Sequence, residues 1–144
     1  MSLHALQWEP VPRPAAQGVG VNILVAEDDA ADRYLIGQAL RHLPRVGLVE
    51  FARDGVEALE LLDGNWIAPD LAIIDLKMPR MDGFRLLVEM GVRSEGALPI
   101  VVLTSSRARN DAVRSLFRGA ARVLVKPDSA HDLEKALGEV IGAI

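Results

Sequence analysis

The sequence predicts an α/β fold in which parallel strands alternate with helices. Short apolar runs rich in β-branched residues occur five times between residues 21 and 125, a pattern typical of strands buried on both faces of a sheet. A segment with apolar residues at helical spacing follows each of these runs. Because strands that alternate with helices require right-handed crossover connections, the helices are expected on both faces of one parallel sheet.

Turn and capping residues set the expected boundaries of the elements. The strands are expected at residues 21–26, 48–52, 71–74, 100–103 and 122–125. Asp28 or Asp29 is expected to cap the first helix, and Pro44 and Gly47 to end it. Ser129 with Asp132 forms a capping box for the last helix.

The three middle helices are expected to begin after Asp54, near Gly83 and at Asp111. The fourth helix of the chain is expected over residues 111–118. Its apolar residues are expected to face the core, and these are Val113, Leu116 and Phe117.

Length and composition restrict the class of protein. Of the 144 residues, 21–144 are expected to form one folded domain, and residues 1–20, with prolines at 10, 12 and 14, a flexible arm. A net charge of −4 argues against a nucleic-acid-binding protein. The absence of cysteine excludes disulfides, thiolate zinc sites and thiol nucleophiles. No apolar run approaches the roughly 20 residues of a membrane span, so a cytoplasmic location is expected.

Polar side chains follow all five predicted strands. Glu27 and Asp28 follow the first strand, Arg53 and Asp54 the second, Asp75 the third, Thr104 the fourth and Lys126 the fifth. The carboxyl ends of parallel strands lie along one edge, where ligands bind in open α/β sheets. Neighbouring carboxylates repel one another unless a cation neutralises them, and an oxygen-only set suits Mg²⁺. Together with a hydroxyl and an ammonium group, these residues indicate a site that receives a phosphoryl group on a carboxylate.

From about Val21 to Ile144 the chain resembles the receiver domain of two-component response regulators. The matching motifs are ILVAEDD at 23–29, DGVEAL at 54–59, DLKMPRMDG at 75–83, LTS at 103–105 and VKP at 125–127. The resemblance implies a doubly wound, flavodoxin-like (βα)5 sandwich with a parallel five-stranded sheet in order 2-1-3-4-5. Ser105-Ser106 and the N-terminal arm are also similar to features of stand-alone receivers that are paired with phytochrome-type kinases.

The resemblance implies a role for each residue at the strand ends. Asp75 would accept the phosphoryl group from the phosphohistidine of a histidine kinase or phosphotransfer protein. Asp28 and Asp75 would hold Mg²⁺ through their carboxylates and Lys77 through its backbone carbonyl, and Glu27 would act on the metal mainly through bound water. Lys126 would pair with a phosphoryl oxygen.

Two further expectations come from the same family pattern. Thr104 would turn toward the phosphoryl group once it is present. The Lys126–Pro127 bond is expected to be cis, which would direct the ammonium group into the site.

One position departs from the family pattern. Receivers usually carry Tyr or Phe three residues before the lysine, and that ring moves with the threonine on activation; here the position is Val123. Phosphorylation should survive this change, but the aromatic readout should not. The fourth helix and its flanks are basic, with arginines at 107, 109, 114, 118 and 122. A homodimer through the fourth and fifth helices is expected.

The resemblance implies a signalling module, not a turnover enzyme, with only self-phosphorylation and slow self-dephosphorylation. A pseudo-receiver that binds partners without phosphorylation is one alternative, which Val123 favours. An Mg²⁺-dependent phosphohydrolase is another, but such enzymes commonly need an Asp two residues after the nucleophile, where Lys77 stands. A nucleotide-binding domain would need glycines where the acidic Glu27-Asp28-Asp29 lies.

Overall fold

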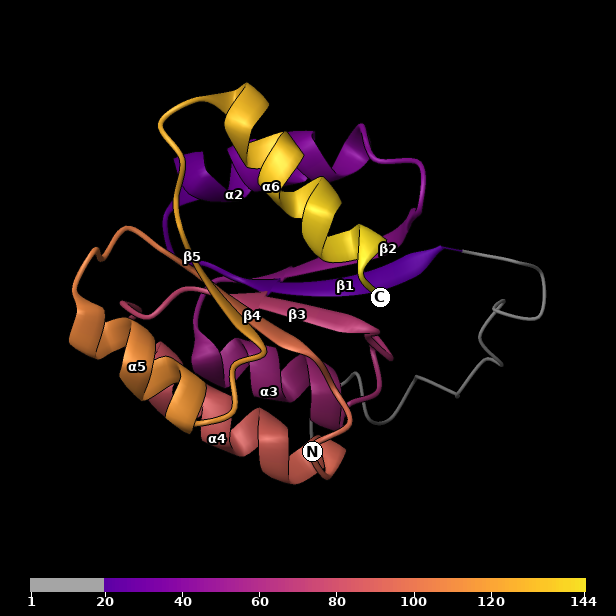
Figure 1. Cartoon of the computed structure of the whole chain (residues 1–144). Coiled ribbons are helices and arrows are strands. Elements are labelled where there is room, and N and C mark those ends of the chain that lie inside the picture. Colours follow the sequence, from indigo (N-terminus) through magenta and orange to yellow (C-terminus); the bar gives the residue numbers. More distant parts are fainter. Residues whose placement is uncertain (1–19) are drawn as a thin grey trace.

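In the computed structural model, which describes residues 20–144, five parallel strands form one sheet in the order β2-β1-β3-β4-β5 (Figure 1). The strands are β1 (Val21–Ala26), β2 (Val46–Ala52), β3 (Leu71–Ile74), β4 (Ile100–Thr104) and β5 (Arg122–Val125). The helices are α2 (Ala30–Arg41), α3 (Gly55–Asp63), α4 (Gly83–Ser94), α5 (Arg109–Phe117) and α6 (Ala130–Gly142). The doubly wound fold and its strand order are therefore confirmed. The flexible arm was expected at residues 1–20. All of these except Gly20 lie outside the described residues.

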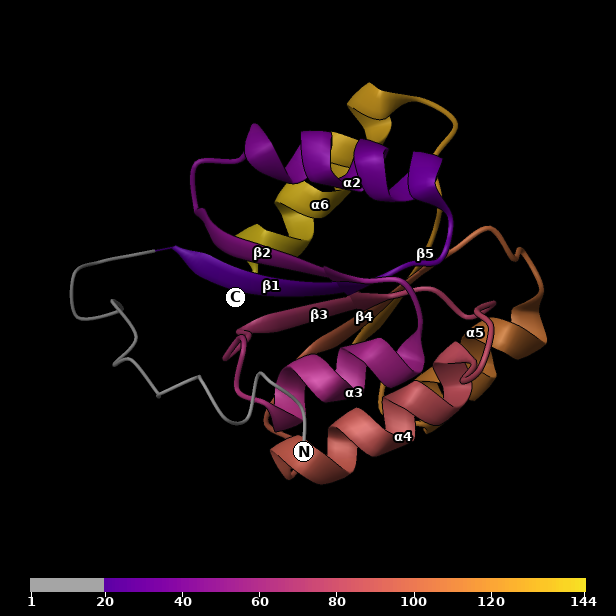
Figure 2. The ribbon, with the colours of Figure 1, turned by 180° about the vertical axis from the view of Figure 1, so that it is seen from behind.

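The helices cover both faces of the sheet. Helices α2 and α6 lie on one face, and α3, α4 and α5 on the other (Figures 1 and 2). Successive residues of a strand point to opposite faces, so Ile23 and Val25 pack with Leu40 and Leu137, whereas Leu24 packs on the α3–α4 side. The central strands β1 and β3 are buried on both faces, which explains their continuous apolar sequences.

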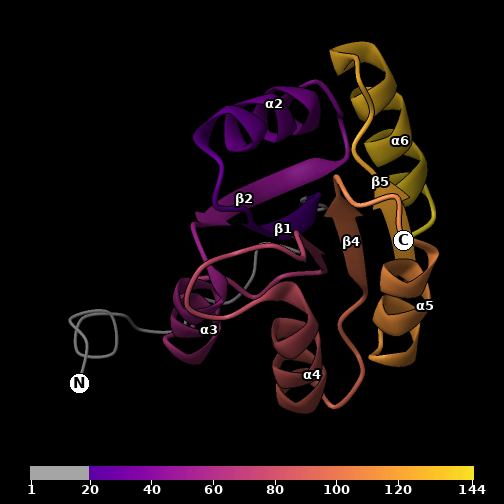
Figure 3. The ribbon, with the colours of Figure 1, turned by 90° about the vertical axis from the view of Figure 1, so that its left-hand side faces the viewer.

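Side chains at the carboxyl edge of the sheet begin four of the five helices. Asp29, Asp54, Asp82 and Ser129 each accept a hydrogen bond, of 2.8–3.1 Å, from the backbone amide three residues later. A cap of this kind contributes about 1 kcal/mol to helix stability. The predicted caps at Asp29 and Ser129 are confirmed, and Figure 3 shows the edge at which the strands end and these helices begin.

Strand β2 begins at Val46, two residues before its predicted start at Leu48. Gly47 therefore lies inside the strand and does not end the preceding helix. A Cβ atom at Gly47 would lie 2.7 Å from Oδ1 of Asn22 and 3.0 Å from the carbonyl oxygen of Gly20. Glycine is required here because β1 and β2 approach closely at this point.

Helix α5 differs most from its prediction. It spans Arg109–Phe117, and its expected inward residues are exposed, with Phe117 at 89%. The buried residue is Ser115, whose hydroxyl donates to the Asp111 carbonyl at 2.7 Å. Because α5 lies at the rim of the sheet beside β5 and α4, only a narrow side of it is covered. The helix's apolar residues therefore face outward. Leu35 of α2, at a helical apolar spacing, is also exposed.

None of the helices in residues 20–144 has both the length and the apolar character needed to cross a membrane.

Candidate functional site

Backbone hydrogen bonds hold the residues that follow the strands. The Asp75 amide donates to the Ala26 carbonyl at 3.0 Å, and the Lys126 amide donates to the Thr104 carbonyl at 2.8 Å. The Glu27 amide donates to the last carbonyl of β2 at 2.9 Å. Each bond continues the pairing of the sheet by one residue, so the side chains at 27, 75 and 126 leave a rigid edge instead of a mobile loop.

Three carboxylates gather at this edge. Oxygens of Glu27, Asp28 and Asp75 all lie within 4.8 Å of one another. Glu27 is 1% exposed and Asp75 6%, while Asp28 is exposed. Two buried carboxylates beside one exposed one give an oxygen-only donor set that opens to solvent on one side. This donor set fits Mg²⁺, which binds through one or two carboxylates and retains water ligands.

Burial raises the pKa of Glu27 to about 7. The charge of Asp75 adds to this increase, whereas the hydrogen bonds from Lys126 and the Asp29 amide oppose it. A cation at the cluster would favour the ionised form of Glu27, because it would offset the cost of burying that charge.

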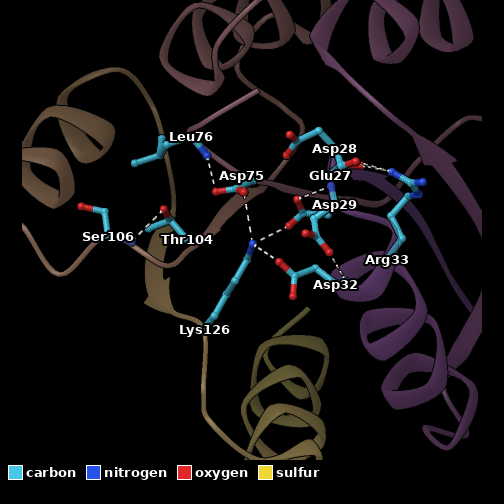
Figure 4. A network of polar contacts seen from close by, with 10 residues as sticks. All are labelled: Glu27, Asp28, Asp29, Asp32, Arg33, Asp75, Leu76, Thr104, Ser106 and Lys126. Carbon is cyan, nitrogen blue, oxygen red and sulfur yellow. Dashed lines mark hydrogen bonds and ion pairs between the residues drawn. The ribbon is translucent and has the colours of Figure 1, made fainter. Parts of the chain in front are cut away.

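The Lys126 ammonium group contacts three carboxylates. Its Nζ atom lies 2.6 Å from Oε1 of Glu27, 2.7 Å from Oδ2 of Asp32 and 3.1 Å from Oδ2 of Asp75 (Figure 4). Burial alone would lower the pKa of Lys126, but the hydrogen bonds to Asp32 and Glu27 and the charge of Asp75 raise it above its usual value. The side chain is therefore a fixed positive charge at neutral pH.

The two oxygens of Asp75 have different partners. Oδ1 accepts a hydrogen bond from the Leu76 amide at 2.7 Å, and Oδ2 accepts one from Lys126 at 3.1 Å. Lys126 reaches Asp75 across a trans peptide, since the described residues contain no cis peptide bond. The predicted cis Lys126–Pro127 bond is therefore wrong, and it is not needed because the end of β5 already directs the side chain toward Asp75.

Thr104 and Lys77 lie at the border of the site. The Thr104 hydroxyl is buried and accepts a hydrogen bond from the Ser106 amide at 3.2 Å, within its own loop. Lys77 is exposed and lines an open groove of about 530 Å³ with Asp28 and Arg114, among others. The roles expected for the Thr104 hydroxyl and for the Lys77 carbonyl remain predictions.

Asp32 is the partner of Lys126 that was not predicted from the sequence. It stands three residues after the Asp29 cap, and its amide donates to Oδ1 of Asp29 at 2.9 Å. An acidic residue at this helical position is explained by capping and by the helix dipole alone. Its contact with Lys126, 94 residues away in the sequence, is visible only in the structure.

The loop after Asp75 is fastened to helix α3. Arg80 has a positive φ of 64°, and its guanidinium group donates through Nε and Nη2 to the Asp54 carboxylate, both at 2.9 Å. Burial acts to raise the pKa of Asp54. The hydrogen bonds from the Glu57 amide and from Arg80 outweigh that effect and lower the pKa below its usual value.

Replacing Arg80 with methionine is expected to lower the free energy of unfolding by about 1 kcal/mol at pH 7, since one partner of the pair is largely exposed. The folded-state pKa of Asp54 lies below the unfolded value, so the pair stabilises above about pH 4. This contribution is lost as the pH falls through the folded-state pKa. Urea unfolding from pH 7 to about pH 3 should therefore show the two proteins converging. Arg85→Met, an exposed control, should show no such trend.

Comparison with known proteins gives concordant matches. The family model for the response regulator receiver domain matches residues 23–138. The chain is 41% identical to the transcriptional regulatory protein PdtaR of Mycobacterium tuberculosis (strain H37Rv) over 115 residues, which are 80% of this chain and 54% of PdtaR. It is 36% identical to FilR2 of Methanothrix harundinacea (strain 6Ac), described as a probable methanogenesis regulatory protein, over 82% of this chain and 79% of FilR2. The chain thus spans about half the length of PdtaR.

Solved structures agree with these matches. The phosphorylated cyanobacterial phytochrome response regulator RcpA superposes with a TM-score of 0.76 at 28% identity, covering 85% of this chain and 91% of RcpA. The Mn²⁺-bound form of response regulator Rcp1 superposes with a TM-score of 0.73 at 28% identity, covering 83% and 91% of the two chains.

Proposed function

Because the chain belongs to the response regulator receiver domain family, we propose that it accepts a phosphoryl group on Asp75 from the phosphohistidine of a histidine kinase or phosphotransfer protein. The phosphorylated domain then signals through protein–protein contacts, as a signalling domain and not a turnover enzyme. A cytoplasmic location is part of the proposal and rests on that kinase partner. The observation that carries the proposal is the buried Asp75 carboxylate between Lys126 and the two acidic residues that follow β1, Glu27 and Asp28.

The geometry around Asp75 suits in-line transfer. One carboxylate oxygen forms the new bond to phosphorus as the bond from phosphorus to the histidine nitrogen breaks. The Leu76 amide fixes Oδ1, so Asp75 keeps one orientation during the attack. Lys126 lies next to Oδ2, where it neutralises charge on a transferred phosphoryl oxygen. Thr104 supplies a second donor once its hydroxyl leaves the Ser106 amide.

Glu27, Asp28 and Asp75 hold Mg²⁺ in this proposal, together with the Lys77 carbonyl. The fit rests on the oxygen-only donor set and on its one exposed member. Bound Mg²⁺ supplies neutralisation of the phosphoryl oxygens. Support also comes from the similar proteins RcpA, which was solved phosphorylated, and Rcp1, which was solved with Mn²⁺.

Incubation with acetyl phosphate and Mg²⁺ is expected to add one phosphoryl group to the chain, as measured by intact mass. The gain should disappear in Asp75→Ala and in the presence of a chelator. Asp128→Asn removes another aspartate, exposed and near Lys126, and should keep the gain. If wild-type protein shows neither a mass gain nor binding of beryllofluoride, the pseudo-receiver alternative takes precedence.

A homodimer through α5 and α6 extends this proposal to output. Val113, Leu116 and Phe117 expose apolar surface on α5, among exposed arginines at 107, 109, 114, 118 and 122. Helix α6 carries exposed acidic residues, Asp132 and Glu139. A twofold axis would place the basic helix of one copy against the acidic helix of the other.

Sedimentation velocity with and without beryllofluoride tests the dimer. We expect the analogue to increase the dimer fraction, and Phe117→Asp to abolish it. A single monomeric species in both conditions, across a wide concentration range, would exclude this contact.

A further inference from the structure

Asp32 forms an ion pair that the proposed chemistry does not use. It lies in the first turn of α2, with a side chain that is 34% exposed, and its Oδ2 atom is 2.7 Å from Nζ of Lys126. The pair joins α2 to the end of β5 on the side of the ammonium group away from Thr104 (Figure 4). Helix capping does not account for it, because the Asp29 amide donates to Oε2 of Glu27 at 3.1 Å and not to the Asp32 carboxylate.

The three carboxylates around Lys126 are not equivalent. Glu27 and Asp75 also belong to the acidic cluster with Asp28, whose oxygens lie within 4.8 Å of one another. Asp32 is outside that cluster and has Lys126 as its charged partner. A divalent cation and the ammonium group therefore compete for the oxygens of Glu27 and Asp75, but they do not compete for Asp32.

This difference predicts what happens if Asp32 loses its charge. An ammonium group without Asp32 would rest on Glu27 and Asp75 alone, the same oxygens that a cation needs. With Asp32 present, one carboxylate stays on Lys126 while the other two are released. The ammonium group then keeps an anchor close to Asp75.

We infer that Asp32 is a positioning residue that holds the Lys126 ammonium group while a divalent cation takes the oxygens of Glu27 and Asp75, and so favours binding of that cation. The same ion pair keeps the ammonium group beside Asp75. The cation-binding part stands on the ion-pair geometry, whereas the benefit to phosphoryl transfer rests on the proposed function.

The test is a calorimetric titration with Mg²⁺ in the absence of any phosphoryl donor. Asp32→Asn is expected to raise the Kd for Mg²⁺ about fivefold, the factor that one partly exposed ion pair can contribute. Asp128→Asn, which removes an exposed charge two residues after Lys126, should leave the Kd nearly unchanged.

A double-mutant cycle separates positioning from direct attraction between Asp32 and the cation. In a Lys126→Met background, Asp32→Asn should change the Kd less than about twofold, because the positioned group is gone. A fivefold loss that persists in this background would overturn the inference. Lys126→Gln serves as a second background, and circular dichroism establishes that each variant is folded.

Two other outcomes also overturn the inference. A purely structural pair would lower the unfolding free energy of Asp32→Asn and leave the Kd unchanged. A wild-type protein that binds no Mg²⁺ would remove the competition altogether. Failure of the proposed function would be seen separately, since the Mg²⁺ titration requires no phosphorylation. If Asp32→Asn raises the Kd only when Lys126 is present, but the protein gains no phosphoryl mass, the inference about Asp32 holds and the proposed function does not.

Discussion

Replacing Lys126 with methionine is expected to lower the free energy of unfolding by about 3 kcal/mol when no divalent cation is present. Lys126 forms ion pairs with Glu27, whose carboxylate is almost fully buried, and with Asp75 and Asp32. Removing the ammonium group leaves these carboxylates facing one another, and two of them, Glu27 and Asp75, are buried. Loss of one partner of a buried ion pair costs far more than the intact pair contributes, because the remaining charge is uncompensated.

Urea unfolding at pH 7 measures this loss, and Mg²⁺ provides the decisive comparison. Saturating Mg²⁺ should stabilise Lys126→Met more than wild-type protein, since a cation at the acidic cluster replaces the missing positive charge. Lys135→Met on the exposed side of α6 is the matched control and should be nearly neutral. An unfolding free energy that is unchanged in Lys126→Met, or a loss that Mg²⁺ does not reduce, would contradict this account of the site.

The main part of the fold follows from local sequence patterns. Strands β1, β3 and β4 are apolar runs that end at a polar residue, and both features remain visible without any tertiary information. The start of β2 was missed because Gly47 normally indicates a turn, whereas here it permits close approach of two strands. The prediction that the apolar residues of α5 face the core was wrong for a similar reason. Periodicity shows that a helix has an apolar side, but not whether the sheet is wide enough to cover it.

The arrangement of the site was predictable to the extent that it follows from parallel strands. Residues just beyond β1, β3 and β5 must lie along one edge, so the proximity of Glu27, Asp75 and Lys126 needs no further information. Side-chain orientation is different, because it depends on competing partners. The Thr104 hydroxyl binds the Ser106 amide, and Asp32 has a second partner that its helical position does not require.

Val123 is part of strand β5, and its side chain carries no polar group. It pairs with Val102 in the sheet and packs, partly buried, against the core on the α3–α4 side. Valine has neither a hydroxyl nor a large ring that could alternate between two positions. The proposed output therefore depends on the loop that carries Thr104 and Ser106, and on the exposed surface of α5.

Replacing Gly83 with alanine is expected to lower the free energy of unfolding by about 3 kcal/mol. Gly83 is buried at the start of α4, and its amide donates to the Leu76 carbonyl at 2.8 Å. A Cβ atom there would lie 2.2 Å from the Asp75 carbonyl oxygen and 2.7 Å from Cα of Leu76. Both are backbone atoms, so no side-chain rotation can relieve the overlap, and the segment that carries the Asp75 carboxylate must move.

The movement should also reduce phosphoryl incorporation at Asp75 by tenfold or more, because a displacement of about 1 Å disturbs alignment for transfer. Gly91→Ala is the matched control, since it lies in the same helix and its Cβ atom would have no neighbour within 4 Å. That variant should be neutral or stabilised by up to about 1 kcal/mol, with unchanged phosphorylation. If the two alanine variants unfold at the same urea concentration, the close approach of α4 to the segment after Asp75 does not constrain the site.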